Sequence, residues 1–437
     1  KTLIPTSVLA GILVLLVSFI YTMAVGPDAS GNYKNLFNTE QFGGNGLDAL
    51  YYITFHCLAL GFIASFFRNN KKEKKKGRFT EVLNTGVTTV SCYLLQGVLG
   101  LGITMIIALF VKDFFPAAGI LLPFGFGQGT GQALNYGTIF ERGGDGAYPP
   151  FKGGANFGLT IAALGFIASS IGGIIFLQHY KRKHPQIKSD ELIDSEDEDT
   201  GNTIVKEAGG GKLSIQLGLI LVAYAVGFGL MYVLGLLIPS LKSTIFGLNF
   251  IFGILGGLLI KLLVNLLRKK NVFKKDIISS ELMSKISNFF FDIMIVAGFA
   301  CIQLELLKDY WWVLLILAVV GTISTYLYNW FVAKTLFKDY AAEQFVMMYG
   351  MLTGTASTGM ILLRELDPRY ETPVADNLVF QNLPAIILGF PMLILATIAP
   401  TQTVLTLCLC AAYFVVLNIF LFRKFIFKKR KKEIKVE

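Results

Sequence analysis

The stretch from Leu121 to Gly137 reads LLPFGFGQGTGQALNYG. Five of its residues are glycine, and they lie among amide and hydroxyl side chains within a strongly apolar chain. Glycine costs about 1 kcal/mol per helical position relative to alanine, so we expect the helix to break here. In a bilayer, freed backbone groups are tolerated only where protein buries them or where they line a wet cavity. The stretch therefore predicts a broken helix beside a polar site within the membrane.

A second stretch of the same kind, GMLTGTASTG, occupies Gly350 to Gly359. When the sequence is aligned with itself so that position 129 falls on position 354, Gly129-Thr130-Gly131 matches Gly354-Thr355-Ala356. Two interrupted apolar segments at corresponding places in two halves are typical of inverted-repeat transporters. We therefore predict two Gly-rich hairpins, at residues 121–137 and 343–363.

The composition indicates a polytopic, all-α membrane protein. Mean hydropathy is +0.60 and only 16% of residues are charged, against about 25% in soluble domains. Several apolar runs exceed the roughly 18 residues needed to cross a bilayer. The predicted spans are residues 3–25, 49–67, 82–111, 154–178, 213–239, 244–267, 288–307, 311–333, 378–398 and 401–422.

Basic residues set the predicted orientation. The runs at Arg68–Arg78 and Lys181–His184 are strongly basic, and such runs favour the cytoplasmic side. Of 39 Lys and Arg, the predicted topology leaves on the external side only Lys34, Lys112, Arg142, Lys152, Lys242 and Lys308. The net charge of +10 is thus explained by topology, and we expect no nucleic-acid partner. In this topology the two hairpins enter from opposite sides.

The predicted organisation has two inverted repeats. Residues 1–180 form the first repeat and 213–399 the second, separated by an acidic cytoplasmic linker at 181–212. Residues 400–437 add a further span and a basic cytoplasmic tail. The first repeat lacks the counterpart of the span at 213–239, so we expect a further helix before Lys1.

Three stretches carry a family resemblance: IPTSVLAGILVLL (Ile4–Leu16), GQGTGQALNYGTIFERGG (Gly127–Gly144) and the run from Gly350 to Gly359. They resemble the bacterial glutamate:sodium symporter family, whose members carry a glycine-rich motif at each of two re-entrant hairpins. Gln128 stands where we expect histidine, and the second motif is richer in threonine. The resemblance implies coupled transport by an elevator motion in a bacterial plasma membrane. In that motion, the spans at 49–67 and 288–307 would move with both hairpins and the spans that follow them. The remaining spans would form a scaffold that also holds a homodimer interface.

Candidate ligand residues follow from the chemistry of a carboxylate and a cation. Helix N-termini and neutral donors bind anions, whereas freed carbonyls suit a hard cation such as Na⁺. The candidate substrate residues are Gln128, Gly129, Thr130, Gly131, Gln132, Asn135, Thr353, Gly354, Thr355, Ser357, Thr358 and Arg364. The candidate ion residues are Asn288, Asp292, Asn156, Gln381 and Asn382, with Asp292 singled out as an intramembrane carboxyl.

The leading hypothesis is a Na⁺-coupled symporter for glutamate or a related small amino-acid or carboxylate anion, with no cofactor besides the coupling ion. A proton-coupled or exchange-type organic-anion carrier on the same scaffold is the alternative. A membrane-embedded enzyme would need convergent acids, histidines or cysteines that the spans lack, and we expect no enzymatic activity. Broken, re-entrant segments also occur in channels, but an inverted pair with unlike polar content favours a closed site near the midplane. Small polar residues also join helices in membranes, which is the competing interpretation of the hairpin residues.

Overall fold

The computed structural model describes residues 4–27, 35–67, 78–184, 200–239, 242–270, 277–368 and 371–426. Within these ranges the long elements are all helices, and nine helices are long and apolar enough to cross a membrane. The prediction of an all-α polytopic membrane protein is therefore confirmed. The remaining residues, including the basic run before Arg78 and most of the acidic linker, lie outside the described part of the chain.

The helices follow the predicted order. In the first part of the chain they are α1 (Thr6–Val25), α2 (Gly46–Phe67), α3 (Arg78–Phe110), α4 (Leu121–Gln128), α5 (Thr130–Glu141), the short α6 (Gly143–Gly146) and α7 (Gly154–Lys183). Then come α8 (Thr200–Leu237), α9 (Lys242–Gly247), α10 (Asn249–Lys269), α11 (Ser280–Ala300), α12 (Trp311–Leu336), α13 (Ala341–Thr353), α14 (Ala356–Arg364), α15 (Val374–Phe380), α16 (Asn382–Ile398) and α17 (Thr403–Leu421). We call α4–α5 hairpin 1 and α13–α14 hairpin 2.

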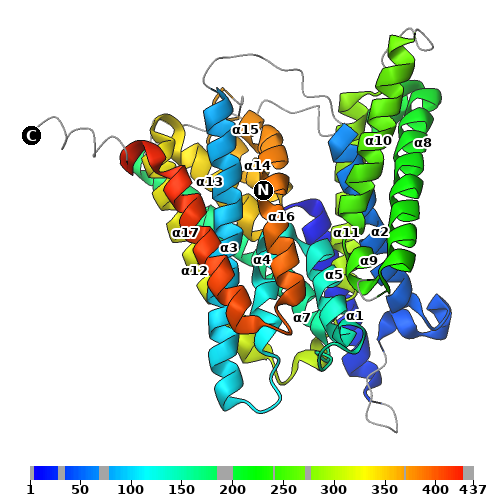
Figure 1. Ribbon diagram of the computed structural model, residues 1–437, viewed down its shortest axis with the longest axis vertical. Helices are drawn as coiled ribbons and strands as arrows, with labels where there is room; N and C mark the ends of the chain where they lie inside the picture. The colour runs from blue at the N-terminus through cyan, green and yellow to red at the C-terminus, as the bar shows by residue number, and fades with distance from the viewer. Residues whose placement is uncertain are drawn as a thin grey trace, which may run out of the picture.

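The helices form two groups, which Figure 1 shows side by side. The hairpin bundle contains both hairpins with α3, α7, α12, α15, α16 and α17, and the companion bundle contains α1, α2, α8, α10 and α11. The bundles meet chiefly where α5 contacts α2 and α11. Hairpin 1 thus lies at the junction of the two bundles.

Packing within the companion bundle differs from our expectation. We expected the spans corresponding to α2 and α11 to pack with the hairpins, and α3, α12 and α17 to belong to a separate scaffold. Instead, α2 packs most extensively on α11, while α3 packs on α12, α16 and α17. Aromatic side chains fit against glycines in the companion bundle: Phe291 lies over Gly61 and Phe299 over Gly11. This complementarity joins α11 to α2 and α1.

Several helix boundaries also differ from the predicted spans. Helix α11 begins at Ser280 rather than Asn288, because the Ser279 hydroxyl accepts the Leu282 N–H at 3.4 Å and caps it. Helix α8 begins at Thr200, inside the predicted linker. The predicted span 378–398 is divided into α15 and α16. Hydropathy underestimates α8 and α11 because their first turns are polar.

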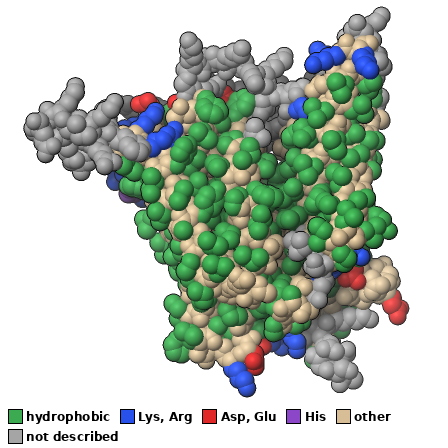
Figure 2. Space-filling view, in the orientation of Figure 1, with side chains coloured by type: hydrophobic (Ala, Val, Ile, Leu, Met, Phe, Trp, Pro, Cys, Tyr) green, Lys and Arg blue, Asp and Glu red, His purple; other side chains and the backbone are tan. Residues whose placement is uncertain are grey.

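The surface matches a membrane environment. Figure 2 shows hydrophobic side chains over the sides of the molecule and charged side chains at its upper and lower ends. Lys181, Arg182 and Lys183 occupy the last turn of α7, and Arg268 and Lys269 that of α10. Cations near helix C-termini are also stabilised by the helix dipole.

Candidate functional site: two broken helices

Hairpin 1 breaks at Gly129. Its φ of 80° and ψ of −171° form a backbone conformation that is open essentially to glycine alone. The break leaves α4 ending at Gln128 and α5 beginning at Thr130. The Tyr93 hydroxyl of α3 donates to the Gly127 carbonyl at 3.0 Å, which satisfies one of the acceptors that the end of α4 exposes. The predicted helix break is therefore present, with a side chain holding its carbonyl end.

Hairpin 2 breaks between Thr353 and Ala356. Helix α13 ends at Thr353, and the Gln96 amide of α3 donates to the Leu352 carbonyl at 3.0 Å. Thr355 then caps α14: its hydroxyl accepts the Thr358 N–H at 3.3 Å. The chain therefore interrupts this helix as predicted, and the second half-helix supplies its own cap.

The two breaks lie close together, although the hairpins enter from opposite ends of the bundle (Figure 1). Tyr93 and Gln96, which hold the two carbonyl ends, are one helical turn apart on α3. On the other side, a Cβ atom at Gly165 of α7 would lie 2.6 Å from the Thr353 carbonyl oxygen and 2.9 Å from the Phe126 ring. Residues from both hairpins thus converge between α3 and α7.

Gln132 stands out at the start of α5. Its side chain is 1% exposed, and neither its amide oxygen nor its amide nitrogen has a partner among the described residues. A buried amide without hydrogen bonds costs on the order of 1–3 kcal/mol. No described side chain caps α5 either. The first turn of α5 therefore combines the positive end of a helix dipole with an amide that lacks a partner.

The neighbours of this turn come from the companion bundle. Thr130 is buried, and its hydroxyl lies 3.4 Å from the Met294 carbonyl of α11. A Cβ atom at Gly131 would meet Leu58 of α2 and the Met294 sulfur. The predicted Thr130 and Gly131 thus lie at the junction of the bundles.

The other predicted substrate residues divide into two sets. Gln128 is half-buried, and Gly129, Asn135, Thr353, Gly354 and Thr358 are buried around the breaks, whereas Ser357 is exposed at the tip of hairpin 2. Arg364 is exposed at the last position of α14, about 12 Å along the helix from the break. The structure therefore separates Arg364 from the residues it was expected to join.

The predicted ion residues do not form one site. Asn156 accepts the Gln303 N–H at 2.7 Å. The Gln381 amide oxygen accepts a hydrogen bond from the Thr89 hydroxyl at 2.7 Å, and its amide nitrogen lies 3.3 Å from the Met351 sulfur. Asn288 and Asn382 are exposed. The five residues thus lie on α7, α11 and the α15–α16 region, and two of them already have protein partners.

Asp292 lies deeper than the sequence predicted. Because α11 begins at Ser280, Asp292 is about 18 Å along the helix, near its middle, rather than one turn inside it. Its side chain is exposed and lies within interaction range of Ser7 on α1. Carboxyl groups within a membrane are energetically costly and are therefore found mainly where they serve a function. This position strengthens Asp292 as a candidate ion- or proton-binding residue.

One polar stripe, on α3, was not predicted from the sequence. Thr85, Thr89, Cys92 and Gln96 recur at helical spacing along one face of α3. They contact, in turn, Gln344, Gln381, Asn329 and Thr325. The signal was present in the sequence as polar residues at intervals of three and four within an apolar span.

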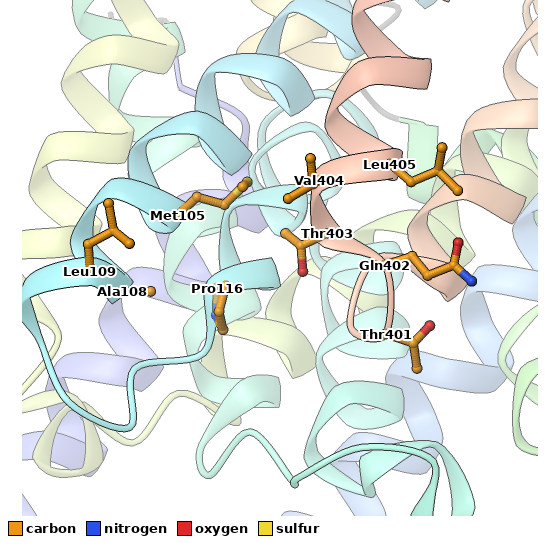
Figure 3. Close-up of a pocket in the computed structure, with 9 residues that line it drawn as sticks. All are labelled: Met105, Ala108, Leu109, Pro116, Thr401, Gln402, Thr403, Val404 and Leu405. Atoms are coloured by element: carbon orange, nitrogen blue, oxygen red, sulfur yellow. The ribbon is translucent and has the colours of Figure 1, made fainter.

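An open groove elsewhere is unrelated to the breaks. It has a volume of about 470 Å³ and is formed by the last turns of α3, Pro116 and the start of α17. Figure 3 shows Met105, Leu109 and Val404 lining it with mainly apolar atoms. Met105 is about 14 Å along α3 from Gln96, so the groove carries no part of the candidate site.

Comparison of the chain with protein-family models, curated protein sequences and solved structures finds no match.

Proposed function

We propose that the chain is a Na⁺-coupled secondary symporter for glutamate or a related small amino-acid or carboxylate anion in the bacterial plasma membrane. The observation that carries this proposal is the meeting of two broken helices from opposite ends of one bundle. They meet beside the Gln132 amide, which has no hydrogen-bond partner in the described ranges. Half-helix N-termini in mid-membrane attract anionic substrate groups, and half-helix carbonyl ends attract cations. The first turn of α5 is the proposed anion site.

Corresponding contacts support the proposed inverted repeats. The pairing of α1 with α11 corresponds to that of α10 with α2, and the pairing of α3 with α16 corresponds to that of α12 with α7. Helices α3 and α12 also each pack on the hairpin that follows them. Equivalent neighbours in the two halves are what a pseudo-twofold axis in the membrane plane would produce.

The division into two bundles supports an elevator motion whose moving and fixed helices differ from those expected from the sequence. We propose that the hairpin bundle moves against the companion bundle, which would also carry a homodimer interface. The interface between them, where Thr130 and Gly131 meet Met294, would then open and close around the solute. The bilayer itself and a small anion are the other partners in this proposal, with the C-terminus and the linker on the cytoplasmic side.

Uptake into proteoliposomes tests this function. The purified full chain would be reconstituted and supplied with glutamate, aspartate and a panel of dicarboxylates under an inward Na⁺ gradient. We expect uptake of at least one anion, and loss of that uptake when choline replaces Na⁺. Failure of every anion in the panel to enter under the Na⁺ gradient would overturn the proposal.

Asp292 favours the proton-coupled or exchange-type organic-anion carrier as a second candidate. A carboxyl near the middle of α11 is a suitable proton carrier. In that case uptake survives in choline, responds to a pH gradient and is lost in Asp292→Asn. Asp309→Asn, which alters an exposed acid beyond the end of α11, serves as the control. Unchanged uptake and unchanged ion dependence in Asp292→Asn would remove Asp292 from either mechanism.

A further inference from the structure

The polar stripe of α3 and its contacts on α12 include two buried amides, one of which bonds to the end of α13 at the break in hairpin 2. Gln96 of α3 is 0% exposed and Asn329 of α12 is 2% exposed. Both amides bond to Thr325: Gln96 Nε2 lies 2.8 Å from its hydroxyl, and Asn329 Nδ2 lies 2.8 Å from its carbonyl oxygen. The two side chains therefore share one threonine in the interior of the hairpin bundle.

The orientation of each amide is fixed by its neighbours. Gln96 Nε2 also donates to the Leu352 carbonyl, and Asn329 Nδ2 donates to the Thr325 carbonyl. A carbonyl oxygen only accepts hydrogen bonds, so the nitrogen of each amide must face it. The amide oxygens are thereby turned away from these contacts. Both are buried and without a hydrogen-bond partner in the ranges that the structure describes.

The end of α13 adds negative potential to the same place. The Leu352 carbonyl, which Gln96 contacts, belongs to the last turn of this 13-residue helix. The C-terminal end of a helix carries a partial negative charge that favours cations. Among the described residues, the hydrogen-bond partners of Gln96, Asn329 and Thr325 include no carboxylate. The free groups here are thus neutral oxygens in a negative field.

We propose that Gln96 Oε1 and Asn329 Oδ1, in the negative field at the end of α13, bind a small monovalent cation, with Na⁺ as the expected ion. Hard cations prefer oxygen ligands. A divalent ion would require carboxylates to offset its loss of hydration, because burying unpaired charge is costly. This inference rests on the proposed symport function, for which it supplies the site of the coupling ion. A buried water that donates to both oxygens is the competing occupant.

Sodium titration of thermal stability tests the site without any substrate. The full chain would be purified in detergent, and its unfolding temperature would be measured as NaCl replaces choline chloride at constant ionic strength. A ligand that binds the folded state raises this temperature in a saturable manner. We expect Asn329→Leu to raise the half-saturating Na⁺ concentration at least tenfold. Asn329→Asp, which places a negative oxygen in the same position, should lower it about tenfold.

Asn249 provides the matched control. It is a fully buried asparagine of α10 whose Nδ2 donates to the Phe55 carbonyl at 2.8 Å and whose Oδ1 is unpartnered within the described chain. It lies in the companion bundle, away from both helix breaks. Asn249→Leu and Asn249→Asp should therefore leave the half-saturating Na⁺ concentration unchanged.

The outcomes separate this site from the proposed function. Equal half-saturating Na⁺ concentrations in wild type and Asn329→Asp would overturn the site even if Asn329→Leu does not fold. Absence of any Na⁺ response in the wild type would overturn it too and assign the oxygens to water. Na⁺-dependent uptake with an unaltered Na⁺ response in the Asn329 variants would reject the site and retain the symporter. A shifted Na⁺ response without uptake of any anion would retain the site and reject the symporter.

Discussion

Hairpin 1 and hairpin 2 break in the same part of the bundle, yet they leave their second half-helices in opposite conditions. Helix α5 begins without a side-chain cap from the described residues and buries the unpartnered Gln132. Helix α14 begins with Thr355 as its own cap, and Ala356 and Ser357 at its tip are exposed. The difference supports the proposal that the first half-helix binds an anion, whereas the second half-helix is already capped by its own threonine.

Replacing Gln132 gives the largest expected effect. Gln132→Leu removes a buried amide that has no partner among the residues the structure describes. We therefore expect anion uptake to fall about 100-fold while the free energy of unfolding rises by about 1–3 kcal/mol. Uptake assays and thermal unfolding in detergent measure the two changes.

Gln381→Leu is the matched control for the expected combination of lower uptake and higher stability in Gln132→Leu. Gln381 is equally buried but accepts the Thr89 hydroxyl, so its loss should lower stability. If Gln132→Leu also lowers stability, the amide has a structural role and the comparison between the hairpins fails.

Enlarging Gly165 should separate the two breaks. The added methyl group of Gly165→Ala meets the Thr353 carbonyl and Phe126, and such overpacking costs about 1–3 kcal/mol. We expect a lower unfolding temperature and impaired uptake. Gly218→Ala on α8, where the added methyl group meets nothing within 4 Å, should be neutral or slightly stabilising. Equal behaviour of the two variants would show that the breaks do not depend on this close approach.

Removing the cap of α14 should have a smaller, local effect. Thr355→Ala is expected to cost about 1 kcal/mol and to speed hydrogen exchange in α14, whereas Thr355→Ser should retain most of the protection. Exchange in α5 should stay at the wild-type rate in both variants. Faster exchange in α5 than in α14 would mean that the Thr355 hydroxyl does not serve mainly as a cap.

The smallest effect concerns acids outside the membrane-spanning helices. Burial raises the pKa of Glu305, an effect that the Lys308 charge partly opposes. The folded carboxyl therefore keeps its proton to a higher pH than the unfolded one, and the free energy of unfolding falls as pH rises through this range. Glu305→Gln should flatten that fall in unfolding temperature as pH rises above the ordinary glutamate pKa of about 4.3.

Glu365 offers the contrast near hairpin 2. It forms an ion pair with Lys181 at 2.6 Å, so Glu365→Gln should leave the fall attributed to Glu305 in place. An identical pH profile in wild type and Glu305→Gln would contradict the assignment to Glu305.

The helix breaks could be predicted from sequence because glycine acts locally. Gly129 breaks its helix through its own backbone conformation, and the capping hydroxyl of Thr355 is close to its target in the chain. The packing of α2 and α11 could not be predicted this way, since it depends on aromatic rings meeting glycines across more than two hundred residues. The hydrogen-bond partners of Asn156 and Gln381 could not be predicted either, because they too are distant in the sequence. Polarity alone does not reveal whether an amide is already bonded.

The hydrogen bonds made by Tyr93 and Gln96 have a mechanical consequence. One turn of α3 donates hydrogen bonds to the carbonyl ends of both α4 and α13. A displacement of that turn would therefore move both ends together. On the proposed assignment, an anion at the first turn of α5 and a cation beside the end of α13 would therefore move together, which would couple the transport of one to the transport of the other.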